Sequence, residues 1–205
     1  MQWWLLAVWG WVAWRGTPRG GWAMGAAVWL AMATQLVLLH ADGLLSVQTA
    51  LPLHLCSLMG LLLPLLLWRA PPVLYEAAFF LGAPAALITL FFPAVIDNSH
   101  PVLMRLAFYT LHVLIAVAPL YLHQTKRPLP TNPRRTLVVG SGYMAAVGVA
   151  NRLLGTNYLF LRAAPAHTPL ALLMQRGTAF YVCALGIVCM AAFCWLAHFR
   201  KYVIM

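Results

Sequence analysis

VLMRLAFYTLHVLIAVAPLYL, residues 102–122, is a run of 21 residues in which Arg105 is the only formal charge. A run of this length forms an α-helix of about 30 Å, which matches the thickness of the hydrocarbon core of a bilayer. An α-helix also pairs its own backbone N–H and C=O groups, as the membrane interior requires. This stretch therefore predicts a membrane-spanning helix.

Similar apolar runs recur along the rest of the chain. Of its 205 residues, 63% are hydrophobic and 8% are charged, and the mean hydropathy is +0.84. A soluble domain carries about a quarter charged residues, so this chain cannot cover itself with polar surface. We predict an all-α, polytopic transmembrane helical bundle, a single domain over 1–205, with six full spans plus a short N-terminal apolar segment (seven in total). The predicted segments are 2–14, 22–40, 48–68, 73–92, 102–122, 136–154 and 177–199.

The charge distribution predicts how the chain is oriented. The formal net charge is +10, and the basic residues lie in short connections between apolar runs. One set of alternating connections holds nine Lys and Arg residues and the other holds four, so the positive-inside rule places the first set in the cytoplasm. We expect a multi-pass protein of the cell inner (cytoplasmic) membrane with a cytoplasmic C-terminus. Basic loops that face anionic lipid explain the charge without nucleic-acid binding.

Several polar residues on separate spans share one predicted depth. Cys56 lies 13 positions from Arg69, or roughly 20 Å along a helix, and His112 lies 14 positions from Lys126, or roughly 21 Å. These distances place both groups in the outer third of the bilayer, with His54 slightly shallower. Other polar residues are predicted near the same level, in the connections or at helix ends: Asp97, His100, Asn151, Arg152, Asn157 and Tyr158. Ionisable groups at such depth are costly and often functional.

Each of these residues also has a plainer interpretation. A membrane histidine can simply bond a neighbouring carbonyl, and a buried free cysteine usually packs as a small hydrophobe, which is our interpretation of Cys183, Cys189 and Cys194. Cys56 differs because Pro52 indicates a helix start or break just before it, and a helix N-terminus lowers the pKa of a nearby thiol. Cys56 would then lie near the end of the first turn, where this effect fades. Arg152 is either a headgroup anchor or a ligand for a lipid phosphate, whereas Arg162 and Arg176 are interpreted as anchors. The cysteines form no CxxC pair and indicate no disulfide framework.

Three blocks of the sequence resemble the YwaF-like family of bacterial integral membrane proteins. They are LPLHLCSL (51–58), HVLIAVAPLYL (112–122) and GTNYLFLRAAP (155–165). The family is similar, more distantly, to animal transmembrane proteins that remodel ether phospholipids by acyl transfer or hydrolyse fatty-acid esters of hydroxy fatty acids. The resemblance implies a nucleophile at Cys56 and a histidine at His112.

Three functions remain open from the sequence. The first is an intramembrane lipid acyltransferase or ester hydrolase, with Cys56 as nucleophile, His112 as base and His54 or Asn157 as an oxyanion donor. The second is a non-catalytic lipid-binding, solute-binding or transport protein. The third is a bis-His haem or metal protein with His54 and His112 as ligands. A metal site formed by His54 and Cys56 is not expected, because these two residues point about 200° apart on a helix.

We favour the enzyme. We expect membrane lipids as partners, with a phospholipid or fatty-acid ester as substrate, no nucleic acid, no cofactor and no metal. The predicted catalytic set is Cys56, His112 and His54, and the predicted substrate-binding set is Asn157, Tyr158, Arg152, Asn151, Asp97 and His100.

Overall fold

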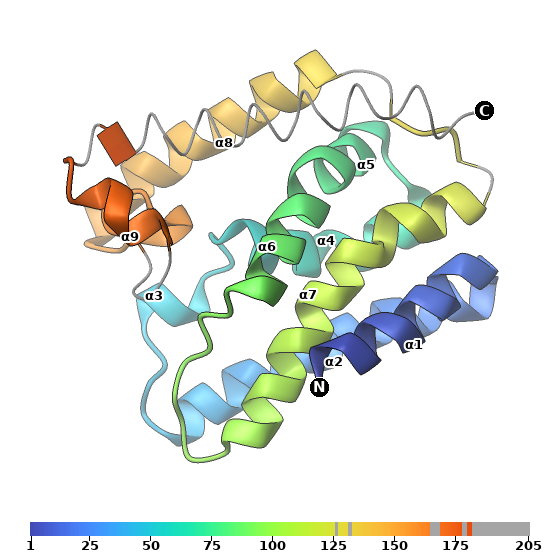
Figure 1. The fold of residues 1–205 in the computed structure, drawn as a ribbon, viewed down its shortest axis with the longest axis horizontal. Coiled ribbons are helices and arrows are strands. Elements are labelled where there is room, and N and C mark those ends of the chain that lie inside the picture. Colours follow the sequence, from blue (N-terminus) through green and yellow to red (C-terminus); the bar gives the residue numbers. More distant parts are fainter. Residues whose placement is uncertain (126, 131–132, 165–168, 178–179, 182–205) are drawn as a thin grey trace. The chain divides into compact units, whose positions relative to one another are not determined.

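The computed structural model describes residues 1–125, 127–130, 133–164, 169–177 and 180–181, which form only helices and connections (Figure 1). The chain divides into two compact units, Met1–Pro130 and Thr131–Met205, and each is described by itself. Most of the predicted last span, together with Cys183, Cys189 and Cys194, lies outside the described residues.

The first unit holds eight helical elements in its described part. They are α1 (Gln2–Arg15), α2 (Pro18–Ala41), α3 (Val47–Ala50), α4 (Leu55–Arg69), α5 (Pro72–Ala77), the π-helical turn η1 (Ala78–Gly82), α6 (Ala83–Phe91) and α7 (Pro101–Gln124). In the second unit, the described elements are α8 (Pro133–Leu154), the 3₁₀ turn η2 (Tyr158–Phe160) and α9 (Pro169–Met174).

Within the described residues, four helical stretches are long and apolar enough to cross a membrane: Pro18–Ala41, Pro72–Phe91, Pro101–Gln124 and Pro133–Leu154. They match the predicted spans 22–40, 73–92, 102–122 and 136–154, so the all-α class and these four helices are confirmed. The N-terminal helix α1 has 14 residues, or about 21 Å, and is short as predicted.

The prediction of six full spans is wrong, because the segment 48–68 is not one helix. It consists of the single turn α3, an extended break, and α4 of 15 residues. The residues Leu51 (φ −77°, ψ 136°) and His54 (φ −75°, ψ 142°) are both extended. Pro52 causes the break, since proline has no N–H to donate and pushes the residue before it out of helical geometry.

The span Pro72–Phe91 stays continuous through a π turn. The Ala83 N–H donates to the Ala78 carbonyl, five residues earlier. In a regular α-helix the ring of Pro84 would meet the Phe80 carbonyl, and the wider π turn accommodates the proline without ending the helix.

Helix α7 packs against α1, α2, α4 and α6 in the centre of the first unit (Figure 1). Small residues let two of these partners approach closely. At Gly21 of α2 a Cβ would overlap the Tyr121 ring, and at Gly60 of α4 a Cβ would overlap the Leu111 side chain. These two close approaches define the register of α2 and α4 against α7.

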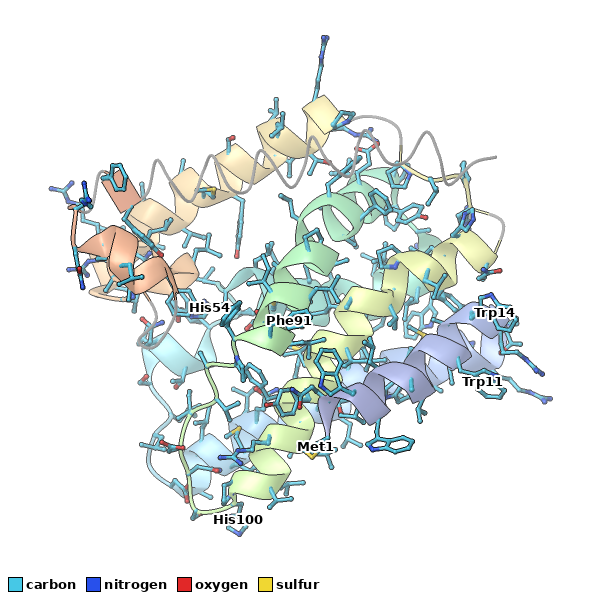
Figure 2. The ribbon with its side chains drawn as sticks, viewed as in Figure 1. Met1, Trp11, Trp14, His54, Phe91 and His100 are labelled. Carbon is cyan, nitrogen blue, oxygen red and sulfur yellow. The ribbon has the colours of Figure 1, made fainter. Side chains whose placement is uncertain are left out.

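One polar link joins the connection after α2 to the connection before α7. The Ser99 backbone N–H donates to Asp42 Oδ2 at 2.7 Å, and the Ser99 hydroxyl donates to Asp42 Oδ1 at 2.5 Å. The Ser99 oxygen also lies 2.8 Å from Nδ1 of His100, whose exposed side chain is seen in Figure 2. These hydrogen bonds tie two connections that are far apart in the sequence.

We predict that this link makes folding stability depend on acidity. The hydroxyl and amide hydrogen bonds from Ser99 lower the pKa of Asp42 from its usual 3.8. A lowered carboxyl pKa stabilises the folded state fully above pH 3.8, and that contribution disappears as the pH falls through the folded-state pKa. Ser99→Ala should therefore raise the Asp42 pKa and destabilise the protein at neutral pH but not in strong acid. Thermal unfolding in detergent against pH measures this, with Asp97→Asn as the control, and a pH-independent difference would contradict it.

Candidate functional site

Cys56 is the second residue of α4. The helix begins at Leu55 with His54 as its N-cap, three residues later than a start at Pro52 would place it. The expectation that Cys56 lies near the end of the first turn is therefore corrected. At the second position the thiol is beside the backbone N–H groups of the first turn, which have no partner within the helix. Those groups and the helix dipole favour a negative charge at this point.

The Cys56 thiol lies beside the Thr89 hydroxyl of α6. The Thr89 hydroxyl donates to the Ala85 carbonyl at 2.9 Å. Cys56 is a free cysteine, half-buried, and packs against the apolar core. Sequence reasoning missed Thr89, whose signal was a single hydroxyl within an apolar run, LGAPAALITLFF (81–92).

His112 is buried on α7, with 6% of its surface exposed. Its Nδ1 lies 2.8 Å from the Phe108 carbonyl oxygen, and its ring stacks on the Phe108 ring with centroids 4.2 Å apart. A carbonyl oxygen only accepts, so Nδ1 carries the proton and Nε2 of the neutral ring keeps its lone pair. Among the described residues, no hydrogen-bond partner occupies Nε2.

Helices α4 and α7 run in the same direction. Near the start of α2, Trp22 contacts Trp68 of α4 with ring centroids 4.4 Å apart. The neighbouring Gly21 packs against Tyr121 of α7. Both contacts lie near the C-terminal ends of α4 and α7, so both helices start at the opposite end of α2.

The close approach of Gly60 to Leu111 then aligns Cys56 with Phe108. Cys56 is about one turn before Gly60, and Phe108 is about one turn before Leu111. The imidazole of His112 reaches back to the Phe108 carbonyl, because helical side chains tilt toward the N-terminus. In the described residues, the imidazole bonds to the Phe108 carbonyl, and no hydrogen bond joins it to the thiol.

The other predicted residues of the first unit lie in its connections. His54 is half-buried, with Nε2 at 3.4 Å from Nε2 of Gln48 on the preceding turn, and its side chain is labelled in Figure 2. Asp97 is exposed in the connection between α6 and α7, and His100 is exposed at the start of α7. Their part in catalysis or substrate binding stays a prediction.

In the second unit, Asn151 organises the chain that follows α8. Its buried side chain accepts at Oδ1 from the Tyr158 N–H (2.7 Å) and the Thr156 hydroxyl (2.9 Å). Its Nδ2 donates to the Tyr158 carbonyl at 2.9 Å. The amide is thus used on both sides to hold the turn GTNY (155–158) against the end of α8.

Asn157 holds the next part of this connection in the same way. Its Oδ1 accepts from the N–H groups of Arg162 (2.9 Å) and Ala163 (3.1 Å), and its Nδ2 donates to the Ala163 carbonyl at 2.8 Å. Between these anchors, Leu159 (φ 56°) and Phe160 (φ 55°) are both left-handed, a conformation that L side chains rarely adopt. Such residues persist where surrounding contacts determine them, and here the two asparagines supply those contacts.

The remaining substrate-binding candidates in the second unit differ in exposure. Tyr158 is fully buried, whereas Arg152, in the last turn of α8, is exposed. These residues and Cys56 lie in units that are described separately, so one shared pocket for both groups stays a prediction. Among the described residues, no three His, Cys, Asp or Glu side chains group as a metal site would require.

The comparisons with known proteins identify the family. The sequence pattern of the TMEM164 family matches residues 2–197. No curated protein and no solved structure shows a significant match. The match covers almost the whole sequence, and the chain has several helices long and apolar enough to span a bilayer. This chain is therefore a multi-pass integral membrane protein of the TMEM164 family.

Proposed function

We propose that this protein transfers or hydrolyses acyl groups of lipid esters within the membrane, with Cys56 as nucleophile and His112 as base. The observation that carries the proposal is the state of the His112 ring: Nδ1 is committed to the Phe108 carbonyl, which leaves Nε2 able to take a proton. The register of α4 against α7 supports the pairing, since it aligns Cys56 with the level to which the imidazole reaches.

The proposed reaction has two steps. In the first, Nε2 of His112 takes the thiol proton while the sulfur attacks the ester carbonyl, and the imidazolium then protonates the departing alcohol. The enzyme now holds an acyl thioester at Cys56. In the second, His112 deprotonates a lysolipid hydroxyl or a water, which attacks the thioester and returns the thiol. The acceptor decides between transfer and hydrolysis.

The first turn of α4 would stabilise the charge that develops on the carbonyl oxygen. The N–H groups at residues 55–57 have no intrahelical partner, as in an oxyanion hole built from backbone donors. His54, the N-cap of the same helix, is the proposed side-chain donor. Asn157, with both ends of its amide used within its own loop, is proposed to shape that loop rather than to contact the oxyanion.

The resemblance of LPLHLCSL (51–58) and its companion blocks to YwaF-like proteins, and through them to animal lipid acyltransferases and ester hydrolases, supports the same chemistry. We propose this relationship together with the function. The remaining predicted substrate contacts, among them Tyr158, Asp97 and His100, stay part of the proposal.

Trapping of the acyl-enzyme tests the proposal directly. Purified protein is mixed with a phospholipid that carries a fluorescent acyl chain, quenched in acid, and mapped by mass spectrometry. We expect a hydroxylamine-sensitive acyl adduct on Cys56 in the wild type and in Cys183→Ala, and none in Cys56→Ala. An adduct that persists in Cys56→Ala, or acyl exchange unchanged in both Cys56→Ala and Cys56→Ser, would end the thiol mechanism. Retained lipid binding without any adduct would favour the non-catalytic alternative.

Thr89 is predicted to position the thiol. Thr89→Val keeps the volume of the side chain but removes the hydroxyl beside Cys56. Loss of a hydroxyl that can donate to the sulfur as it gains negative charge, a hydrogen bond of about 1 kcal/mol, should slow acylation of Cys56 by about 5-fold. Thr110→Val on α7 is the matched control and should acylate at the wild-type rate. The single-turnover rate with the fluorescent lipid measures the effect, and equal rates for both variants would remove Thr89 from the site.

A further inference from the structure

The second unit contains a cavity of about 350 Å³ at one end of α8. Among the described residues, its walls are formed by Gly148 and Arg152 of α8 and by Arg162 of the following connection. A volume of this size falls at the lower end of the range of small-molecule sites. It fits a compact polar group better than a whole lipid.

The charges around this cavity are unbalanced within the second unit. Residues 131–205 contain no Asp or Glu, since the three acids of the chain are Asp42, Glu76 and Asp97. Two guanidinium groups beside one cavity repel each other unless an anion lies between them. The planar fork of arginine donors matches the oxygen atoms of a phosphate or carboxylate.

Arg162 is held in position before any ligand arrives. Its Nη1 donates to the carbonyl oxygens of Thr156 (3.3 Å) and Asn151 (3.5 Å), and its backbone N–H donates to Asn157. Arginine has five N–H donors, so Nε and Nη2 remain for a ligand. A side chain that is already ordered loses less entropy on binding, which favours affinity.

The position of the cavity along α8 indicates which anion reaches it. The helix has 22 residues, or about 33 Å, with Arg134 and Arg135 near its first residues and Arg152 in its last turn. A helix of this length brings both ends to the headgroup regions of a bilayer. Beside Arg152, the side chains of Leu153 (80% exposed) and Val149 (60% exposed) offer apolar surface. The abundant anion at this level is phosphate.

We propose that the cavity formed by Gly148, Arg152 and Arg162 is a phosphate-binding site, for a phospholipid headgroup or for free phosphate. The site is independent of the thiol chemistry, and only the identification of a bound phospholipid as the acyl substrate rests on the proposed function. Binding is therefore measured in the Cys56→Ala background, so that a failure of the phosphate site and a failure of the thiol mechanism are distinguished.

Gly148 offers a test that leaves both arginines in place. A Cβ at Gly148 would meet no atom within 4 Å, so Gly148→Leu extends into open space beside the cavity. Gly142→Leu is the matched control, since Gly142 lies on the same helix and is equally open. Both substitutions should preserve α8, because leucine favours a helix more than glycine does.

The probes are short-chain phosphatidylcholine, inorganic phosphate and a short-chain diacylglycerol without phosphate, each titrated while the melting temperature is recorded in detergent. We expect a phosphate-bearing probe to stabilise the protein and diacylglycerol to have no effect. Arg152→Ala should weaken binding of the phosphate-bearing probe by about 10-fold, the effect of one charge-assisted hydrogen bond. Gly148→Leu should weaken it by filling the cavity, and Gly142→Leu should match the background protein.

The two sources of phosphate are distinguished by the same titrations. Stabilisation by phosphatidylcholine at concentrations where inorganic phosphate has no effect assigns the site to a lipid headgroup, and equal or better stabilisation by inorganic phosphate assigns it to free phosphate. Either result supports the site. Equal stabilisation by diacylglycerol, no stabilisation by either phosphate-bearing probe, or wild-type affinity in both Gly148→Leu and Arg152→Ala would overturn it.

Discussion

Replacing His112 by alanine is expected to slow acylation of Cys56 by roughly 100- to 10,000-fold, the usual contribution of a general base. The imidazole is the only group that the proposed mechanism assigns to the thiol proton. Its Nδ1 hydrogen bond to Phe108 leaves Nε2 for that task. The measurement is the single-turnover rate of thioester formation with the fluorescent phospholipid.

Two further measurements separate a chemical role from a structural one. Added imidazole should partly restore acylation in His112→Ala, which a purely structural defect would not allow. His123→Ala is the matched control, because His123 is exposed at the far end of the same helix and should leave the rate unchanged. A wild-type rate in His112→Ala, with the fold intact, would remove the base from the mechanism.

Replacing Asn151 by alanine should destabilise the second unit by roughly 2–4 kcal/mol. The change removes three side-chain hydrogen bonds, each worth about 1 kcal/mol, and leaves buried partners on Thr156 and Tyr158 without them. Leu159 and Phe160 would then lose one of the anchors that keep them left-handed. The melting temperature in detergent and the rate of proteolysis within residues 155–164 measure the effect.

Two neighbouring substitutions make this prediction specific. Leu153→Ala, at a side chain that is 80% exposed and lacks polar atoms, should leave the stability almost unchanged. Asn151→Asp keeps the accepting oxygen but loses the donor to the Tyr158 carbonyl, so its stability should fall between those of the wild type and Asn151→Ala. If Asn151→Ala and Leu153→Ala have the same melting temperature, the turn is stable without the Asn151 hydrogen bonds.

The amino-acid pattern alone was enough to predict membrane helices. Runs such as 102–122 are long, apolar and nearly uncharged, and the bilayer accepts such a run only as a helix. Pro52 also indicated an interruption, since the missing N–H of proline is a local property. The prediction of one span over 48–68 was wrong because the apolar pattern continues through the break. Composition alone therefore joined α3 to α4.

Which side chains meet depends on how the helices pack. The start of α4 at Leu55 moved Cys56 to the head of its helix, and packing against α6 brought Thr89 to the thiol. Asn151 was predicted to bind substrate, yet its amide is used by the turn that follows α8. Helix formation depends on neighbours within a few residues, whereas such contacts depend on how each helix is rotated and shifted against segments far away in the sequence, which no local pattern encodes.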